Sequence, residues 1–338
     1  MMQKIYLFFL LIFISCSIDD GDQIIEPSIN NWVFVACEGN YGASNGSITM
    51  INDSGEIKSV SDLGDVVQSL EVYKNKLFVI VNNSHKIIAF DITKDGLRLP
   101  GIEIDTKNSS PREMKIVNDK LYFTNWNTSD IQILNLNNYV IEDFIKVDGK
   151  PESIEYDGNN LWVGIQLNED YSDGNKLLKI NTDNNSILES FEIGKGPTSI
   201  SIINKNVYVA NTYYDAQYNA YYGTSRVNTI ENKVDINNYG PGIVCGGDVL
   251  NFNNEIFRSF DGGIAKLGDD LKILDETKIG SYDPAQLYSS KIIGEYIYFG
   301  ITNFQDINVV KVLDFNNNEI SSYNVGLIPG DFAYWESN

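Results

Sequence analysis

The chain is poor in the residues on which most familiar catalytic and metal sites depend. Its 338 residues include one histidine, His85, and three cysteines. Zinc clusters, cysteine–histidine pairs and Ser-His-Asp triads need more of these side chains than the sequence offers. The composition therefore argues against the common hydrolytic mechanisms, and we expect neither a resident metal nor a cofactor.

Positive charge is also scarce, with 25 Lys and Arg against 46 Asp and Glu and a formal net charge of -21. A protein with this negative charge repels the phosphate backbone of nucleic acids, so we expect no nucleic-acid partner. Hydrophobic residues make up 43% of the chain, which allows a large core and excludes intrinsic disorder. The 40 Asn and 27 Gly residues predict short strands joined by many tight turns.

An apolar run, Ile5–Ile14, follows Lys4 near the N-terminus. It is too short to span a membrane and is typical of a secretory signal, which we assign to residues 1–15. Its end, Phe13-Ile14-Ser15-Cys16, resembles a bacterial lipobox. That resemblance implies that Cys16 carries a lipid and begins the mature protein; ordinary cleavage is the alternative.

The segment Ser17–Asp22 is acidic and resembles the export tag of surface lipoproteins of Bacteroidota. The resemblance implies a protein that is lipid-anchored in the outer membrane and exposed at the cell surface. In the alternative interpretation these acids only begin a solvated tether. We assign residues 16–31 to an acidic flexible tether and residues 32–338 to one folded domain.

One apolar-aromatic strand recurs seven times along residues 32–338. Its aromatic anchors lie 40 to 49 residues apart and are Phe34, Phe78, Tyr122, Trp162, Tyr208, Phe257 and Tyr298. This spacing matches one four-stranded propeller blade. A strand that begins at Pro111, Pro151 or Pro197 precedes its anchor, and two more strands follow. Each unit is thus predicted to run A-B-C-D, with the anchor on strand B.

The two ends of the domain complement each other. The first unit begins with strand B at Trp32, whereas Pro329–Tyr334 matches strand A of the fourth unit. Joining them completes one blade and covers the last open sheet edge. The sequence therefore predicts an all-β fold, a seven-bladed β-propeller with four-stranded blades. This register separates Cys37 from Cys245, so we expect no disulfide between them.

The repeat resembles the seven-bladed propellers of the surface-layer, YncE-like and lactonase-like superfamily through Val207–Asn211 and the Gly-x-x-Pro of Gly194–Pro197. A lactonase-like enzyme would need clustered acids, His or Arg at the central tunnel. The A strands offer no His and only Arg112, Glu113, Glu152 and Asp331. We therefore expect a binding protein rather than an enzyme.

Antiparallel blades bring the D-to-A and B-to-C loops to one face, here called the loop face. Its longest B-to-C loop, 211–224, holds Tyr213, Tyr214, Tyr218, Tyr221 and Tyr222. Long loops on a rigid scaffold commonly carry binding, so we favour a ligand platform. The alternative is that strands B and C extend into a longer hairpin whose tyrosines pair across strands.

Other candidate ligand-binding residues reach the same face: Tyr41, Asn82, Asn125, Trp126, Tyr171, Asn211, Phe260 and Phe304. Arg112, Glu152 and Asp331 add candidates near the axis, although such residues often only hydrogen-bond buried backbone. We expect His85, on a short turn, to be solvated rather than a ligand. The glycine of the acidic loop 168–174 does not stand where the sequence pattern of a calcium-binding loop requires it. A calcium site in this loop is therefore only a minor alternative.

The opening Glu38–Ile48 resembles that of Bacteroidota propeller lipoproteins, a group that includes surface proteins which capture vitamin B12. The resemblance spans residues 32–337. It implies cobalamin as the small-molecule ligand and a TonB-dependent outer-membrane transporter as the partner. A glycan would stack on the same aromatic rings, and an adhesion or interaction role without a small ligand is a further alternative.

Overall fold

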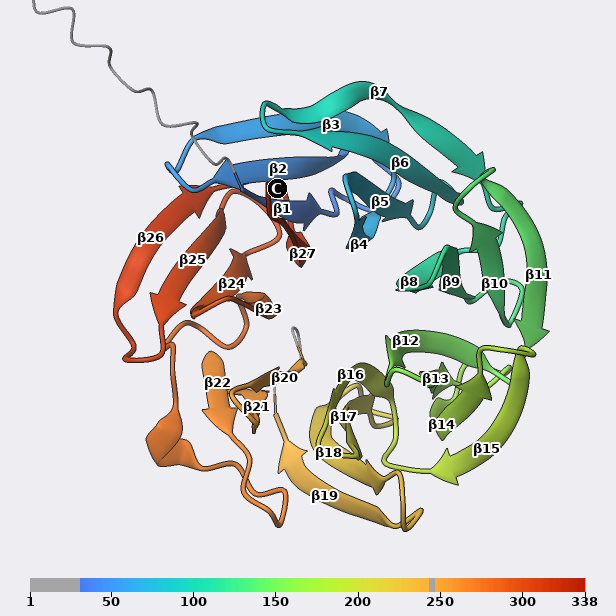
Figure 1. Cartoon of the computed structure of the whole chain (residues 1–338). Coiled ribbons are helices and arrows are strands. Elements are labelled where there is room, and N and C mark those ends of the chain that lie inside the picture. Colours follow the sequence, from blue (N-terminus) through green and yellow to red (C-terminus); the bar gives the residue numbers. More distant parts are fainter. Residues whose placement is uncertain (1–30, 243–246, 338) are drawn as a thin grey trace, which may run out of the picture.

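The computed structural model describes residues 31–242 and 247–337. The expected signal peptide, residues 16–30 of the expected tether with Cys16, and Cys245 lie outside the described residues. The described residues form seven antiparallel sheets around a central axis, which confirms the predicted all-β propeller (Figure 1). Their one helix is a short 3-10 turn, η1 (Asp275–Thr277), so none is long and apolar enough to cross a membrane.

Six blades have four strands in the order A-B-C-D. Blades 1 to 4 consist of β27 (Pro329–Trp335), β1 (Trp32–Cys37), β2 (Gly46–Asn52) and β3 (Ile57–Gly64); β4 (Val67–Tyr73), β5 (Lys76–Val81), β6 (Lys86–Thr93) and β7 (Gly96–Asp105); β8 (Pro111–Val117), β9 (Lys120–Asn125), β10 (Asp130–Asn135) and β11 (Val140–Lys146); and β12 (Lys150–Tyr156), β13 (Asn160–Leu167), β14 (Asp173–Asn181) and β15 (Ser186–Glu192).

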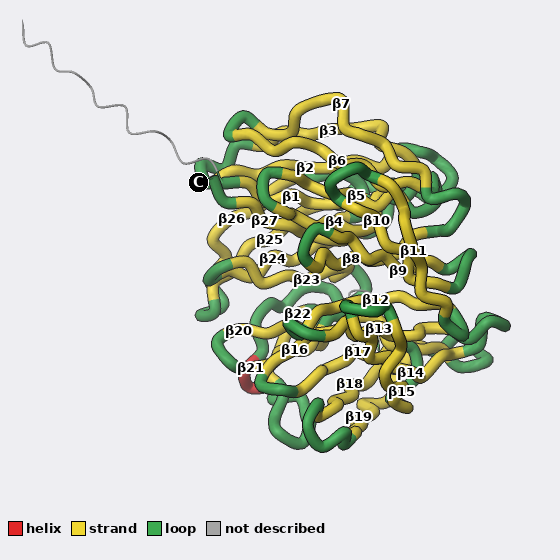
Figure 2. The backbone as a smooth tube through the Cα atoms, turned by 45° about the vertical axis from the view of Figure 1, so that its right-hand side comes forward, coloured by secondary structure: helices red, strands yellow, loops and turns green. Residues whose placement is uncertain are grey.

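Blades 5 to 7 complete the ring. They consist of β16 (Pro197–Ile203), β17 (Asn206–Tyr214), β18 (Ala220–Asn228) and β19 (Val234–Pro241); β20 (Val249–Phe252), β21 (Glu255–Phe260) and β22 (Gly263–Lys266); and β23 (Leu287–Ile293), β24 (Tyr296–Thr302), β25 (Asn308–Asp314) and β26 (Glu319–Asn324). Strand A of each blade lies nearest the axis (Figure 1), and loops connect the strands at the edges of the ring (Figure 2).

The predicted closure of the ring is confirmed. Strand β1 pairs with β2 on one side and with β27 on the other, where Val33 lies opposite Tyr334. The Trp335 indole Nε1 donates a hydrogen bond to Asn75 Oδ1 in blade 2 at 3.0 Å. The C-terminal strand therefore supplies strand A of the first blade and contacts its neighbour.

Blade 6 differs from the predicted four-stranded A-B-C-D unit. Its described residues form strands A, B and C but no regular strand D. Beyond β22 only isolated bridges continue the sheet, Ile264 to Ile279 and Leu267 to Ile273. The segment from Leu267 to Ile279 contains a turn at residues 268–270 and the 3-10 turn η1. Acidic residues in both turns interrupt any alternation of apolar and polar residues. Without that alternation no regular fourth strand can cover the blade.

Each of the seven interfaces between neighbouring blades holds its own apolar cluster. Five of the aromatic anchors are at most 1% exposed: Phe34, Phe78, Tyr122, Trp162 and Phe257. The cluster between blades 5 and 6 is the smallest, with only Ala210, Val249 and Ile256 fully buried. This interface is therefore the least apolar in the ring. Cys37 is buried between blades 7 and 1 as a free thiol.

Candidate functional site

Connections from neighbouring blades contact each other on the loop face. Asn82, in a B-to-C turn, donates through Nδ2 to the carbonyl of Pro111 at 2.7 Å. The amide of Ser110, in the next D-to-A loop, donates to Nδ1 of His85 at 3.1 Å. His85 is half-buried, so its ring remains in part solvated, and it also holds the neighbouring loop through this hydrogen bond.

The three candidate asparagines lie beneath the loop surface and bind the protein itself. Asn82, Asn125 and Asn211 are at most 7% exposed. Asn125 Nδ2 donates to the Phe123 carbonyl at 3.0 Å, and Asn211 Nδ2 donates to the Gly194 carbonyl at 2.9 Å. Their amides therefore hold the loops in place and do not face solvent.

Exposed aromatic rings occur in the B-to-C connections of four blades, or at the strand end that leads into one. The exposed fractions are 81% for Tyr41, 62% for Tyr171, 51% for Tyr214, 87% for Tyr218 and 43% for Phe304. These connections share one end of the ring because all strands B run in the same direction along the axis. The loop face thus presents several separate aromatic surfaces to solvent.

The predicted loop 211–224 is wrong in its extent, and the extended hairpin is what the structure shows. Strands β17 and β18 remain paired up to Tyr214 and Ala220, which leaves only residues 215–219 as a turn. Tyr213 and Tyr221 lie directly opposite each other with ring centroids 5.4 Å apart. Cross-strand aromatic contact favours the longer hairpin over an irregular loop.

The acidic loop near Tyr171 is also shorter than predicted, with β13 ending at Leu167 and β14 beginning at Asp173. Lys150 Nζ donates to Glu169 Oε2 at 2.8 Å and lies 5.4 Å from the Tyr171 ring centroid. Hydrogen bonds from Lys150, Ser129 and the backbone amide of Gly149, with the charge of Lys150, lower the pKa of Glu169 to about 2. The described residues contain no group of three His, Cys, Asp or Glu side chains placed to share a metal ion.

At the loop end of the axis, Arg112 is held from three sides. Its Nε and Nη2 each donate to one oxygen of Glu152 at 2.8 Å, and Nη1 donates to Gln68 at 2.9 Å. Its guanidinium carbon lies 4.4 Å from the Trp126 ring centroid. The structure thus brings together three candidates, Arg112, Glu152 and Trp126; Arg112 and Glu152 satisfy each other, whereas the buried Trp126 Nε1 has no hydrogen-bond partner among the described residues.

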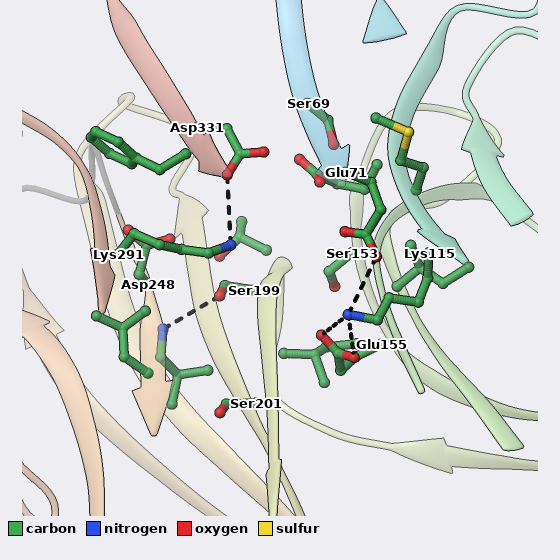
Figure 3. A pocket seen from close by; sticks show the side chains of 18 of the residues that line it. Ser69, Glu71, Lys115, Ser153, Glu155, Ser199, Ser201, Asp248, Lys291 and Asp331 are labelled. Carbon is green, nitrogen blue, oxygen red and sulfur yellow. Dashed lines mark hydrogen bonds and ion pairs between the residues drawn. The ribbon is translucent and has the colours of Figure 1, made fainter. Parts of the chain in front are cut away.

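Deeper along the axis, the A strands enclose a cavity of about 440 Å³. Lys115 Nζ lies 2.8 Å from Glu155 and 3.9 Å from Glu71 on one wall. On the opposite wall Lys291 lies 3.7 Å from Asp331 (Figure 3). Asp331 therefore lines the cavity, away from the exposed aromatic rings.

The expectation that the axis offers only Arg112, Glu113, Glu152 and Asp331 is wrong. The cavity wall also contains Glu71, Lys115, Glu155, Asp248 and Lys291. Alternate residues of a strand share one face, so Glu113 and Lys115 both point inward from β8. Applying this period of two to every strand A would have identified most of the set.

The cavity wall carries more acids than bases, which shifts their protonation. Burial raises the pKa of Glu71 and Asp248. Burial, reinforced by the charge of Asp331, raises the pKa of Glu113 well above its usual value. Burial opposes the charge of Lys115, but Glu71 and Glu155 hold its pKa above normal. Glu71, Glu113 and Asp248 therefore stay protonated up to a higher pH than the same carboxylic acids in water.

A second cavity, of about 310 Å³, opens between blades 5 and 6 on the loop face. It brings together two candidates, Tyr222 from β18 and Phe260 from β21, beside the buried Arg258. Sequence reasoning did not single out Arg258. The sequence did contain a clue to it. In the sixth strand B the apolar run ends at Phe257, whereas in the other six units the residue after the aromatic anchor is also apolar.

Comparison with known protein families and with curated proteins finds no match for this chain. Solved structures do match. A 6-phosphogluconolactonase candidate from Bacteroides fragilis has a TM-score of 0.61 and 15% identity, covering 90% of this chain and 98% of its own. This chain is a seven-bladed β-propeller. At such low identity, the likeness extends to the fold alone.

Two further solved structures match over similar lengths. A hypothetical selenium-binding protein from Sulfolobus tokodaii has a TM-score of 0.62 and 8% identity, covering 86% of this chain and 88% of its own. AztD from Citrobacter koseri has a TM-score of 0.57 and 12% identity, covering 91% and 98%. Neighbours with such different descriptions leave the function to be argued from the sites of this chain.

Proposed function

We propose that the chain is a surface capture protein that binds a small solute on its loop face. The observation that carries the proposal is a set of exposed rings, with Tyr41, Tyr171, Tyr218 and Phe304 in B-to-C connections and Tyr214 at the end of β17. Rigid, amphipathic rings give large contact area at low cost in conformational entropy. A closed propeller holds these connections in fixed positions around the axis.

Cobalamin is the first ligand to test. Its corrin is broad and flat and carries amide arms, which suits separated aromatic rings with hydroxyl groups. The resemblance of the opening Glu38–Ile48 to B12-capturing surface propellers supports the same choice. A glycan also stacks on tyrosine faces and is the second candidate.

The proposal also includes a cellular location and a protein partner. A lipid on Cys16 would anchor the protein in the outer membrane, and the acidic segment Ser17–Asp22 would direct it to the cell surface. A captured solute would then pass to a TonB-dependent transporter in the same membrane. Replacing Cys16 with Ala should release the protein from the membrane fraction. Continued palmitate labelling of that variant would contradict the anchor.

Calorimetry tests the binding proposal directly. Residues 20–338 are titrated with cyanocobalamin and with a glycan panel, in parallel with the triple variant Tyr41→Ala, Tyr171→Ala, Tyr218→Ala. We expect the variant to lose at least tenfold in affinity with an unchanged melting temperature. The matched control is Tyr296→Ala, because Tyr296 is 43% exposed but begins β24 at the opposite face. Failure of the parent protein to bind either ligand would overturn the proposal.

A further inference from the structure

The cavity of about 440 Å³ that the A strands enclose, here called the axial cavity, lies within the size range of small-molecule sites. On one of its walls Lys115 and Glu155 satisfy each other at 2.8 Å. Two other charged side chains of the wall, Lys291 and Glu113, lack a hydrogen-bonded counter-ion among the described residues. They carry opposite charges, so the axial cavity contains one unfilled positive and one unfilled negative group.

Lys291 supplies the positive group from β23. Its Nζ lies 3.7 Å from Asp331 Oδ1, which is too far for a hydrogen bond (Figure 3). The Lys291 side chain is 47% exposed although it lies at the axis, so solvent reaches its ammonium inside the ring. The charge of Asp331 raises the pKa of Lys291, which therefore stays protonated at neutral pH. A fixed cation thus offers its N–H donors to the cavity.

Glu113 supplies the negative group from β8. It is half-buried, it lines the cavity, and Ser69 hydrogen-bonds its carboxyl group. No ion pair reaches it among the described residues, because the other charged groups of β8, Arg112 and Lys115, pair with other acids. Burial and the charge of Asp331 raise the pKa of Glu113 well above its usual value. The two carboxyl groups thus repel each other when ionised, and a bound cation would relieve that repulsion.

The two unfilled groups face the cavity from different sides. Strand β23 belongs to blade 7 and β8 to blade 3, and they lie across the axis from each other (Figure 1). Lys291 and Glu113 form no ion pair with each other, yet the charge of each shifts the pKa of the other. They are therefore far enough apart to admit a ligand and close enough for one small molecule to contact both.

A ligand with a single charge could satisfy only one of these groups. A simple amine would pair with Glu113 and leave Lys291 without an acceptor. A simple carboxylate would pair with Lys291 and add a negative charge to a wall that already has more acids than bases. A zwitterion satisfies both groups and leaves the net charge of the cavity unchanged. It therefore avoids the cost of an uncompensated charge in a partly buried site.

We propose that the axial cavity binds a small zwitterion, an α-amino acid, whose ammonium pairs with Glu113 and whose carboxylate accepts hydrogen bonds from Lys291 Nζ. Asp331, which lies beside Lys291 and repels Glu113, adds to the attraction for the ammonium. This second site lies on the axis and not among the exposed rings of the loop face. The inference therefore goes beyond the proposed function and does not depend on it.

The probes are L-serine, ethanolamine and 3-hydroxypropanoate, each titrated into residues 20–338 and followed by calorimetry. Ethanolamine lacks the carboxylate of serine, and 3-hydroxypropanoate lacks its ammonium, so the three molecules separate the two contacts. We expect L-serine to bind at least tenfold more tightly than either analogue. No binding of L-serine, or an analogue that binds as tightly as L-serine, would overturn the inference.

Each contact has its own variant. Lys291→Met should weaken L-serine at least tenfold without weakening ethanolamine, because ethanolamine has no carboxylate to lose a partner. Glu113→Gln should weaken L-serine at least tenfold without weakening 3-hydroxypropanoate. The second variant keeps the size of the side chain, so it tests the inference even where Lys291→Met fails to fold. Unchanged L-serine affinity in Glu113→Gln would contradict the assigned contact.

Two controls locate the site. Lys311 also belongs to blade 7, but it lies on β25 and pairs with Glu319 at 2.8 Å, so Lys311→Met should leave L-serine affinity unchanged. The loop-face triple variant Tyr41→Ala, Tyr171→Ala, Tyr218→Ala should also bind L-serine as the parent does. Loss of L-serine binding in that triple variant would move the amino acid to the loop face and overturn the axial site. Cyanocobalamin and glycan binding do not bear on this outcome.

Discussion

Arg112 and Glu152 lie 40 residues apart, yet two parallel hydrogen bonds of 2.8 Å join them across blades 3 and 4. The Glu152 side chain is 8% exposed, and that of Arg112 is 20% exposed. Both charges are thus largely removed from water, and each depends on the other. The pair connects neighbouring blades at the loop end of the axis.

Removing one partner of this pair should be more damaging than removing both. Arg112→Met leaves a buried carboxylate without its cation, and we expect a loss of about 3 kcal/mol in the free energy of unfolding. The double variant Arg112→Met, Glu152→Met replaces both charges by apolar side chains and should recover most of that loss. Urea unfolding at pH 7 measures both. Equal stability of the single and double variants would contradict this account.

Glu38 should make the protein less stable as the pH rises. Burial raises its pKa from 4.5 to about 7, although Tyr288 donates to its Oε1 at 2.8 Å. Between these pH values the folded state holds a proton that the unfolded state has lost, so the free energy of unfolding falls as pH rises from about 4.5 to 7. Above pH 7 this contribution is fully lost.

The variant Glu38→Gln removes the titration and keeps an oxygen for Tyr288. We expect it to be more stable than the parent by about 1 to 3 kcal/mol at pH 8 and to differ little at pH 4.5. Urea unfolding of both proteins at half-unit pH steps gives the difference curve. A difference that stays constant from pH 4.5 to 8 would show that Glu38 titrates normally.

The fold was predictable because its information is repeated along the chain. Seven aromatic anchors and a matching segment at each end determine blade number and closure without reference to any single contact. Blade 6 was the exception, because residues 268–277 alternate neither in the pattern of a strand nor in that of a helix. A repeat rule fails where a single copy departs from it.

The site was harder to predict because side-chain environment depends on neighbours in other blades. Tyr213 and Tyr221 read as loop residues in the sequence but stack across paired strands. Asn125 and Asn211 read as ligand groups but bind backbone carbonyls. Arg258 could have been found by comparing the seven copies position by position, since it is charged where the others are apolar.

The tyrosines of the β17–β18 hairpin should separate into two classes. Tyr221 stacks on Tyr213, so Tyr221→Ala should reduce the free energy of unfolding by about 1 kcal/mol. Tyr218 is 87% exposed at the turn, so Tyr218→Ala should leave stability within about 0.5 kcal/mol of the parent. Thermal unfolding of both variants measures the difference. Equal effects would mean that the stacked pair does not stabilise the hairpin.

Closure by β27 should be essential for a soluble monomer. Deleting residues 327–338 removes the partner of β1 and the hydrogen bond from Trp335 to Asn75, and it exposes an unpaired edge beside the core. An exposed, apolar edge strand pairs readily with other chains, so we expect aggregation or failure to fold. Deleting only residues 336–338 leaves β27 intact and should preserve a monomer with a melting temperature near that of the parent. Size-exclusion chromatography and thermal unfolding compare the three proteins, and a monomeric longer deletion with an unchanged melting temperature would refute the closure.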